Sequence, residues 1–346
     1  MRVELDGIRY WRHDLTGCLH ITMAALLGYH GLDPLEVLGA GWGFFYDPRE
    51  LRREEYYFPC RQKSLLGSLA PYHGVSSRWH QPEDAEAGWR EVREAVASGR
   101  PVGVAVDNFQ LPFRPAYQDV HTNHMITVFG FDDERGEALV TDPVPPRFTG
   151  PLDISVLTRA RTSPNPIAGE RDLFFTANPI ANRWLDIEPP TQVPEFDRDF
   201  LREVIAANLR GYREGGDDGD DGSGTDPATY QGLAGERRFL DDIADKLAAG
   251  RTEAADEGFV VAGPVLATTG LHADWLARAG RIFGDARLIE AARAVERVAH
   301  HWSAFRIAVA TAREAPPDAA GPLRTRAATL VADHDRALDL LDRALG

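Results

Sequence analysis

One run of apolar and turn-forming residues constrains how this chain can fold more than any other. Residues 125–129 are apolar and favour strands, residues 132–136 have turn chemistry, and residues 138–140 form a second short apolar run. Two such runs around one turn predict a β-hairpin. A hairpin of this length brings Asp142, at the end of its second strand, back beside His124, at the start of its first.

A second pattern, about a hundred residues earlier, places a cysteine at the start of a predicted helix. Thr16 is suited to be the N-cap, and His30 and Gly31 supply a C-terminal stop. Between them, apolar residues recur at helical spacing: Leu19, Met23, Leu26 and Leu27. Cys18 then lies in the first turn, where the positive end of the helix dipole favours a thiolate. Its own backbone N–H is a natural donor to an oxyanion.

Taken singly, these residues have ordinary structural roles. A cysteine on a helix is usually a small apolar core residue, and an Asp-Pro pair is usually a turn. Taken together and in this chain order, they predict a cysteine nucleophile, its base and an orienting carboxylate. The predicted catalytic residues are Cys18, His124 and Asp142.

The order of these motifs resembles the papain-like fold, especially as found in bacterial double-glycine-leader peptidases. A longer series of motifs is similar to the family of butirosin biosynthesis protein H. The motifs that carry this resemblance are Gly17-Cys18, Gly41 to Tyr46, Gly99 to Asp107, Leu111 to Phe113 and His124 to Asp142. The resemblance implies a papain-like N-terminal domain joined to a helical C-terminal domain, with the nucleophile at Cys18, the histidine at His124 and the aspartate at Asp142.

The same resemblance implies an activity and its partners. The named member of that family is an acyltransferase that moves an aminoacyl chain from an acyl carrier protein to an amine of an aminoglycoside. By this resemblance, the donor is a phosphopantetheine thioester on an acyl carrier protein and the acceptor is a small-molecule amine.

One departure from the papain-like pattern concerns the oxyanion site. Papain-like enzymes place a glutamine a few residues before the cysteine, where this chain has Arg12, His13 and Asp14. Arg12 and His13 are therefore the candidates for a side-chain oxyanion donor.

Composition sets limits on the class of protein. The chain has 346 residues, 43% of them hydrophobic, which is enough for one large or two ordinary domains with a substantial core. No apolar stretch is long enough to cross a bilayer, and the N-terminus lacks the pattern of a signal peptide, so we expect a cytoplasmic protein with no membrane partner. The two cysteines, Cys18 and Cys60, form no CxxC or Cys/His ligand spacing, and we predict no metal and no cofactor.

Charge argues against one class of partner. The net charge of −15 argues against a nucleic-acid-binding role, because phosphates require clustered basic residues. An acidic carrier protein would need a local basic patch. The densest group of basic residues that could supply one, or could simply be a solvated helix face, is Arg49, Arg52, Arg53, Arg61 and Lys63.

The chain divides into three regions in an α+β arrangement. Residues 1–185 form the predicted papain-like catalytic domain, and residues 186–229 a linker region that contains one helix near 197–212 and an acidic Gly-rich loop. Residues 230–346 show apolar positions at helical spacing and predict an α-helical domain. Its last apolar series, over 323–345, offers a surface for a homodimer.

Three residues are predicted to contact substrate. Asp107, at the end of a buried strand, is placed to contact an amine, with a turn capped by its own side chain as the alternative. Phe45 and Tyr46 belong to a Gly- and aromatic-rich loop that could line the cleft or plug the core. His121 is read as solvent-facing or as an alternative base.

These observations support one function and leave others open. The favoured function is a cysteine-dependent acyltransferase of specialised-metabolite biosynthesis that acts through an acyl-enzyme on Cys18. A cysteine hydrolase, meaning a peptidase, amidase or thioesterase, or a cyclase would use the same residues. A non-catalytic binding protein that keeps a papain-like cleft is the third alternative.

Overall fold

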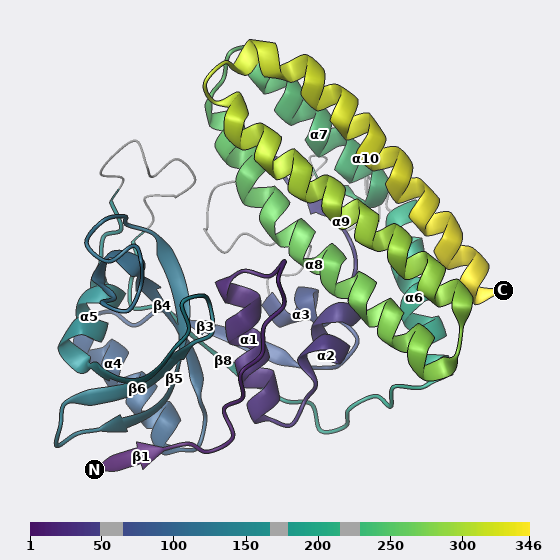
Figure 1. Cartoon of the computed structure of the whole chain (residues 1–346). Helices are drawn as coiled ribbons and strands as arrows, with labels where there is room; N and C mark the ends of the chain where they lie inside the picture. Colours follow the sequence, from purple (N-terminus) through teal and green to yellow (C-terminus); the bar gives the residue numbers. More distant parts are fainter. Residues whose placement is uncertain (49–64, 167–178, 215–228) are drawn as a thin grey trace, which may run out of the picture.

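The computed structural model describes residues 1–48, 65–166, 179–214 and 229–346. An antiparallel sheet flanked by short helices occupies the N-terminal part, and long helices form a bundle in the C-terminal part (Figure 1). The predicted mixture of a sheet-containing N-terminal region and a helical C-terminal region is confirmed.

The sheet of the described residues has seven strands in the order β3-β8-β4-β5-β6-β7, with β1 paired to β5. Every pair of neighbouring strands is antiparallel. The strands are β1 (Arg2–Glu4), β3 (Ser76–His80), β4 (Val102–Asp107), β5 (Asn123–Asp132), β6 (Glu137–Asp142), β7 (Phe148–Asp153) and β8 (Trp184–Glu188).

Helices cover both faces of this sheet because its central strands are apolar on both sides. Along β4, Ala105 packs on one side and Val104 and Val106 on the other. The first side is covered by α1 (Cys18–Tyr29), α2 (Pro34–Ala40) and α3 (Leu65–Leu69), and the second by α4 (Ala85–Ala97) and α5 (Ile154–Thr162). Gly103 lets α1 approach closely, since a Cβ there would lie 2.8 Å from Thr22 Cγ2.

The predicted hairpin is present as β5 and β6. Its turn is held by Asp132, whose Oδ1 accepts hydrogen bonds from the N–H groups of Glu134 (3.0 Å) and Arg135 (3.2 Å). Gly136 has φ +67°, a conformation that favours glycine. The register pairs Thr127 with Thr141, which brings the end of β6 to the beginning of β5.

The bundle contains four long helices and a fifth that precedes them. They are α6 (Arg198–Arg213), α7 (Gly232–Ala248), α8 (Glu253–Phe283), α9 (Ala286–Ala312) and α10 (Pro316–Leu345). One apolar cluster runs through all five and forms the largest part of the core. Within the described segments, none of the helices combines the length and apolar character needed to cross a membrane.

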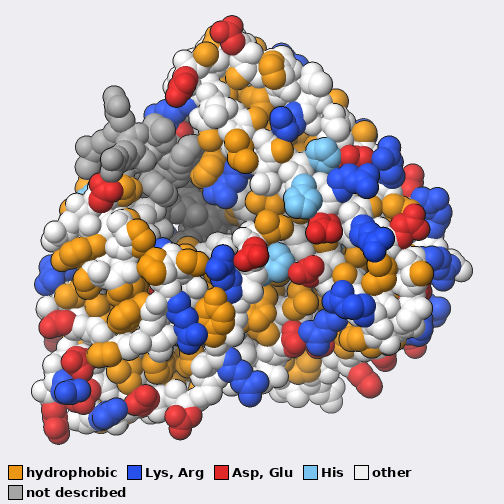
Figure 2. All heavy atoms as spheres, in the orientation of Figure 1, with side chains coloured by type: hydrophobic (Ala, Val, Ile, Leu, Met, Phe, Trp, Pro, Cys, Tyr) orange, Lys and Arg blue, Asp and Glu red, His pale blue; other side chains and the backbone are white. Residues whose placement is uncertain are grey.

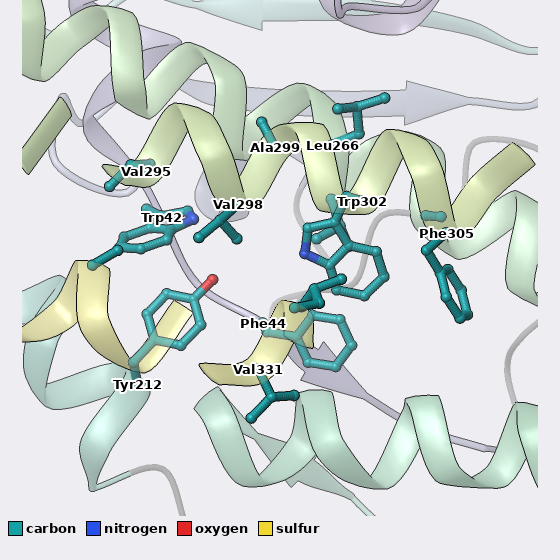
Figure 3. Packing of buried hydrophobic residues seen from close by; sticks show 14 of the residues in the cluster. Trp42, Phe44, Tyr212, Leu266, Val295, Val298, Ala299, Trp302, Phe305 and Val331 are labelled. Carbon is teal, nitrogen blue, oxygen red and sulfur yellow. The ribbon is translucent and has the colours of Figure 1, made fainter. Parts of the chain in front are cut away.

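A loop from the N-terminal part inserts into this bundle. The ring of Trp42 stacks with the rings of His272 (centroids 5.1 Å apart) and His334 (4.8 Å), on α8 and α10. Its indole N–H donates a hydrogen bond to Thr269 Oγ1 at 3.2 Å. Figure 3 shows Trp42 and Phe44 surrounded by bundle side chains. The bundle core is therefore built in part from residues of the first fifty.

The position of this loop corrects one predicted substrate contact, that of Tyr46. Tyr46 is fully buried, and its hydroxyl donates to Asp242 Oδ2 on α7 at 2.9 Å. Phe45 and Tyr46 form β2 (Phe45–Tyr46), which pairs with β9 (Tyr230–Gln231) at the bundle. The loop is a core plug, the alternative that its glycines and aromatic residues also allowed, because its rings find an apolar bundle interior to fill.

Two elements lie differently from the predicted regions. β8 ends at Glu188, so the sheet extends past the boundary predicted at 185. α6, inside the predicted linker, packs on the bundle through Leu201, Val204 and Ile205. The acidic Gly-rich loop falls mostly outside the described residues.

The inserted loop yields a prediction about stability. Phe44 is 4% exposed beside Trp302 and Phe239, whereas Phe45 is only half-buried. Phe44→Ala should lower the free energy of unfolding by about 3–5 kcal/mol, because it leaves a cavity in the bundle. Phe45→Ala, the matched control, should cost about 1 kcal/mol. Urea unfolding followed by circular dichroism measures both, and equal losses would contradict this placement.

Candidate active site

Cys18 is the first residue of α1 and is half-buried. The predicted helix start is correct, but the predicted cap is wrong. Gly17 is the N-cap, and the Thr16 hydroxyl instead donates to the carbonyl of His13 at 2.8 Å. Because the first N–H groups of a helix have no partner within the helix, the backbone at Cys18 offers donors beside the thiol.

His124 and Asp142 meet as the hairpin geometry predicts. The imidazole Nε2–H of His124 donates to Asp142 Oδ2 at 2.8 Å. His124 is 4% exposed and Asp142 is fully buried. The contact is therefore shielded from water, and it fixes which imidazole nitrogen remains for another partner.

The Cys18 side chain hydrogen-bonds to His124 as well. Since Nε2 is occupied by Asp142, the nitrogen left for the sulfur is Nδ1. Burial by itself lowers the pKa of His124, but the charges of Asp142 and Cys18 and their hydrogen bonds raise it to about 9. The structure thus brings the three predicted catalytic residues into one connected group in which the imidazole favours its protonated form.

Arg114 is a member of this group that the sequence did not reveal. Its Nη1 donates to Asp142 Oδ2 at 3.1 Å and to the carbonyl of Val144 at 2.9 Å. The other carboxylate oxygen of Asp142 accepts the N–H of Val144 at 3.0 Å. Asp142 is held from three directions, and its charge is shared between a guanidinium and an imidazole. The only sequence signal was a single arginine in an otherwise uncharged run after a buried strand.

Neither candidate for a side-chain oxyanion donor is directed at Cys18 by its described contacts. His13 Nε2 lies 3.2 Å from Asp274 Oδ2 on α8, and its Nδ1 accepts the N–H of Leu15 at 3.3 Å. Arg12 pairs with the exposed Asp14 at 3.3 Å. The N–H groups at the start of α1 remain as hydrogen-bond donors beside the Cys18 thiol.

The segment before Cys18 packs directly on the bundle. Gly270 of α8 faces Leu15, and a Cβ at position 270 would lie 2.5 Å from Leu15 Cδ1. Nearby, Arg278 of α8 forms ion pairs of 2.8 Å with Asp33 and with Glu36. The bundle therefore supports the chain on both sides of α1.

Asp107 does not offer a carboxylate to substrate. It is fully buried, and its oxygens accept hydrogen bonds from Phe109 N (3.0 Å), Thr122 N (3.2 Å), His121 Nδ1 (2.6 Å) and Ser163 Oγ (2.5 Å). The prediction that it contacts an amine is corrected: it holds its own turn and the ring of His121, as the alternative interpretation allowed.

Several predicted features lie outside the described residues: Cys60, Arg49, Arg52, Arg53, Arg61 and Lys63. On the face drawn in Figure 2, basic and acidic side chains are intermixed over the helical bundle. Within the described ranges, no group of three or more His, Cys, Asp or Glu side chains is arranged to hold a metal ion.

The raised pKa of His124 predicts a pH dependence of stability. A group whose pKa rises on folding from 6.5 to about 9 stabilises the folded state fully below pH 6.5, and this contribution is lost as the pH rises through 9. Over that range, the stability of the wild type relative to His124→Gln should fall by about 3 kcal/mol. Denaturant unfolding at a series of pH values measures it, and parallel pH profiles would refute the assignment.

The contacts of Arg114 predict a second effect on stability. Arg114→Met removes one of the donors to the buried Asp142 and should lower the free energy of unfolding by about 1–3 kcal/mol. Arg147 is an exposed control, with its guanidinium 4.6 Å from the ring centre of Tyr10. Arg147→Met should change stability by about 0.5 kcal/mol or less. A loss no larger for Arg114→Met than for the control would contradict the role of Arg114.

Comparison with known families bears directly on this site. Residues 17–143 match the family model described as butirosin biosynthesis protein H, N-terminal. The match begins one residue before Cys18 and ends one residue after Asp142, so it contains the whole connected group, Arg114 included. Among curated proteins, no match to the chain is found. The resemblance that the sequence predicted is confirmed over residues 17–143.

Proposed function

We propose that this chain is a cysteine-dependent acyltransferase of antibiotic or related specialised-metabolite biosynthesis, with a papain-like catalytic region. It moves an acyl or aminoacyl group from a carrier-protein thioester to an amine through an acyl-enzyme on Cys18. The observation that carries the proposal is the chain of contacts from half-buried Cys18 through the buried His124 to the buried Asp142. The family name supports a role in biosynthesis.

The first half of the reaction follows from the charge state of this group. With the pKa of His124 raised to about 9, the imidazolium can pair with a thiolate at neutral pH. The Cys18 sulfur attacks the thioester carbonyl, and the helix N-terminus donates to the developing oxyanion. The carrier thiolate leaves and takes the proton from His124. Asp142 keeps the imidazole oriented and stabilises its charge.

The second half decides between transfer and hydrolysis. An amine that attacks the acyl-enzyme gives an amide and returns the thiolate to Cys18, whereas water gives an acid. The biosynthetic family favours an amine, and the amide bond that forms is far more stable than the thioester that breaks. A hydrolase would use the same three residues, so the fate of the acyl-enzyme distinguishes the two functions.

The carrier protein and the amine acceptor rest on the sequence resemblance. The apolar series over 323–345 does not offer the predicted dimer surface, because Leu323, Leu330, Leu338 and Leu341 are buried in the bundle core. The bundle supports the chain around α1 through Leu15 and through Arg278, so it can hold the catalytic region while a partner docks. Such support fits an enzyme with a single catalytic group of residues that must receive both a large carrier protein and a small amine.

The proposal predicts a covalent adduct on one residue. Incubation with a panel of carrier-protein thioesters and small thioesters should add the mass of the acyl group to the wild type, and Cys18→Ala should gain none. A primary amine should then discharge the adduct as an amide. Intact-protein mass spectrometry follows both steps, and circular dichroism checks that the variant is folded.

The second cysteine of the chain provides the control. Cys60→Ala keeps Cys18 and removes the one other thiol of the chain. It should therefore acquire the adduct at the wild-type rate. An adduct on Cys18→Ala, or none on folded wild-type protein with any donor, would refute the acyl-enzyme. Discharge by water at an equal rate with and without amine would identify a hydrolase instead.

A further inference from the structure

A second pair of an imidazole and a carboxylate lies at the same end of the sheet. Asp107 ends β4 opposite Asn123, directly beside the pair formed by Val106 and His124. Its Oδ2 accepts a hydrogen bond from His121 Nδ1 at 2.6 Å. Two such pairs therefore lie at this end of the sheet, and only the pair of His124 is used by the mechanism above.

His121 is held in one orientation and one tautomer. Asp107 is fixed by four donors, and the His121 ring stacks on Phe109 with centroids 4.0 Å apart and planes 12° from parallel. Because Nδ1 carries the proton that it donates to the carboxylate, the lone pair of the neutral ring is on Nε2. This is the arrangement of a base.

The Nε2 atom of His121 is not fully buried. The His121 side chain is 15% exposed, whereas Asp107 is fully buried. Among the residues that the structure describes, Nε2 has no hydrogen-bond partner and is not one of the buried polar atoms. His121 is three residues from His124, so their Cα atoms lie within about 10 Å of each other.

We propose that His121 is a second catalytic base, which takes a proton from the amine acceptor as it reaches the acyl-enzyme. This inference rests on the proposed function and extends it to the acceptor. A primary alkylamine is protonated at neutral pH and cannot attack until it loses a proton. Two protons must leave its nitrogen before the amide is complete, and one imidazole holds only one of them.

The step balances when the two histidines act in turn. The ammonium gives its first proton to His121 Nε2, and the free amine forms a C–N bond with the acyl carbon. The second proton goes from nitrogen to His124, and the C–S bond breaks to leave the Cys18 thiolate beside the imidazolium. His121 then releases its proton to solvent. The amide carries the remaining hydrogen, and no further reactant is needed.

His121→Asn tests this role with little change to the turn. The asparagine amide nitrogen can keep the donor to Asp107, but the variant has no Nε2. The wild type and the variant are first acylated at Cys18 with the same small thioester, and the discharge of the adduct is followed by intact mass at about pH 8. One arm uses a primary alkylamine, and the other uses methoxyamine, which is already unprotonated there.

The variant should discharge to the alkylamine about 100-fold more slowly than the wild type, and to methoxyamine within about threefold of it. A structural defect in the variant would slow discharge of the adduct to both nucleophiles by the same factor. His80→Gln is the matched control, since it alters another ring that stacks on an aromatic side chain and bonds a carboxylate, here Trp184 and Asp186. It should match the wild type in both arms.

Two results would overturn the inference while leaving the acyl-enzyme intact: wild-type discharge to the alkylamine by His121→Asn, or an equal slowing with both nucleophiles. If the wild type itself never acquires the adduct, the proposed function is wrong, and so is the role of His121 that rests on it. The acylation step of the same samples separates these two failures.

Discussion

The insertion of Trp42 into the helical bundle is the contact on which the rest of this molecule depends. Trp42 is covered by rings from two bundle helices, and its indole nitrogen is bonded to a third residue there. The loop that carries it follows α2, and α2 packs beside α1. The apolar surface that stabilises the bundle thus also fixes the helix that begins with Cys18, and the two parts form one structure.

Within the site, the corresponding constraint is the buried charge of Asp142. A carboxylate without water must have strong partners, and Asp142 has Arg114 and His124 at the same oxygen. The guanidinium alone would satisfy the carboxylate without giving any chemistry. The imidazole of His124 links the carboxylate to the sulfur of Cys18, because Asp142 and Cys18 both raise the pKa of that imidazole.

The sequence predicts the site well where the chemistry is local and less well where it is not. The hairpin between His124 and Asp142 follows from strand propensity and a turn, and the helix at Cys18 follows from apolar spacing. Trp42 was ambiguous because an aromatic loop suits a cleft and a core equally. Arg114 could not be found, since a lone arginine reveals nothing of the carboxylate it meets. Asp107 was assigned to substrate because one sequence does not show the hydrogen-bond donors that surround its carboxylate.

The contact of Gly270 with Leu15 has a consequence for how such a protein can change over time. A Cβ at position 270 would lie 2.5 Å from the end of the Leu15 side chain, which would have to move, and Leu15 lies three positions before Cys18. At this position the helical part fits closely against the segment before Cys18. A substitution at position 270 of α8 is therefore constrained by the segment that leads to Cys18, although the two lie more than 250 residues apart along the chain.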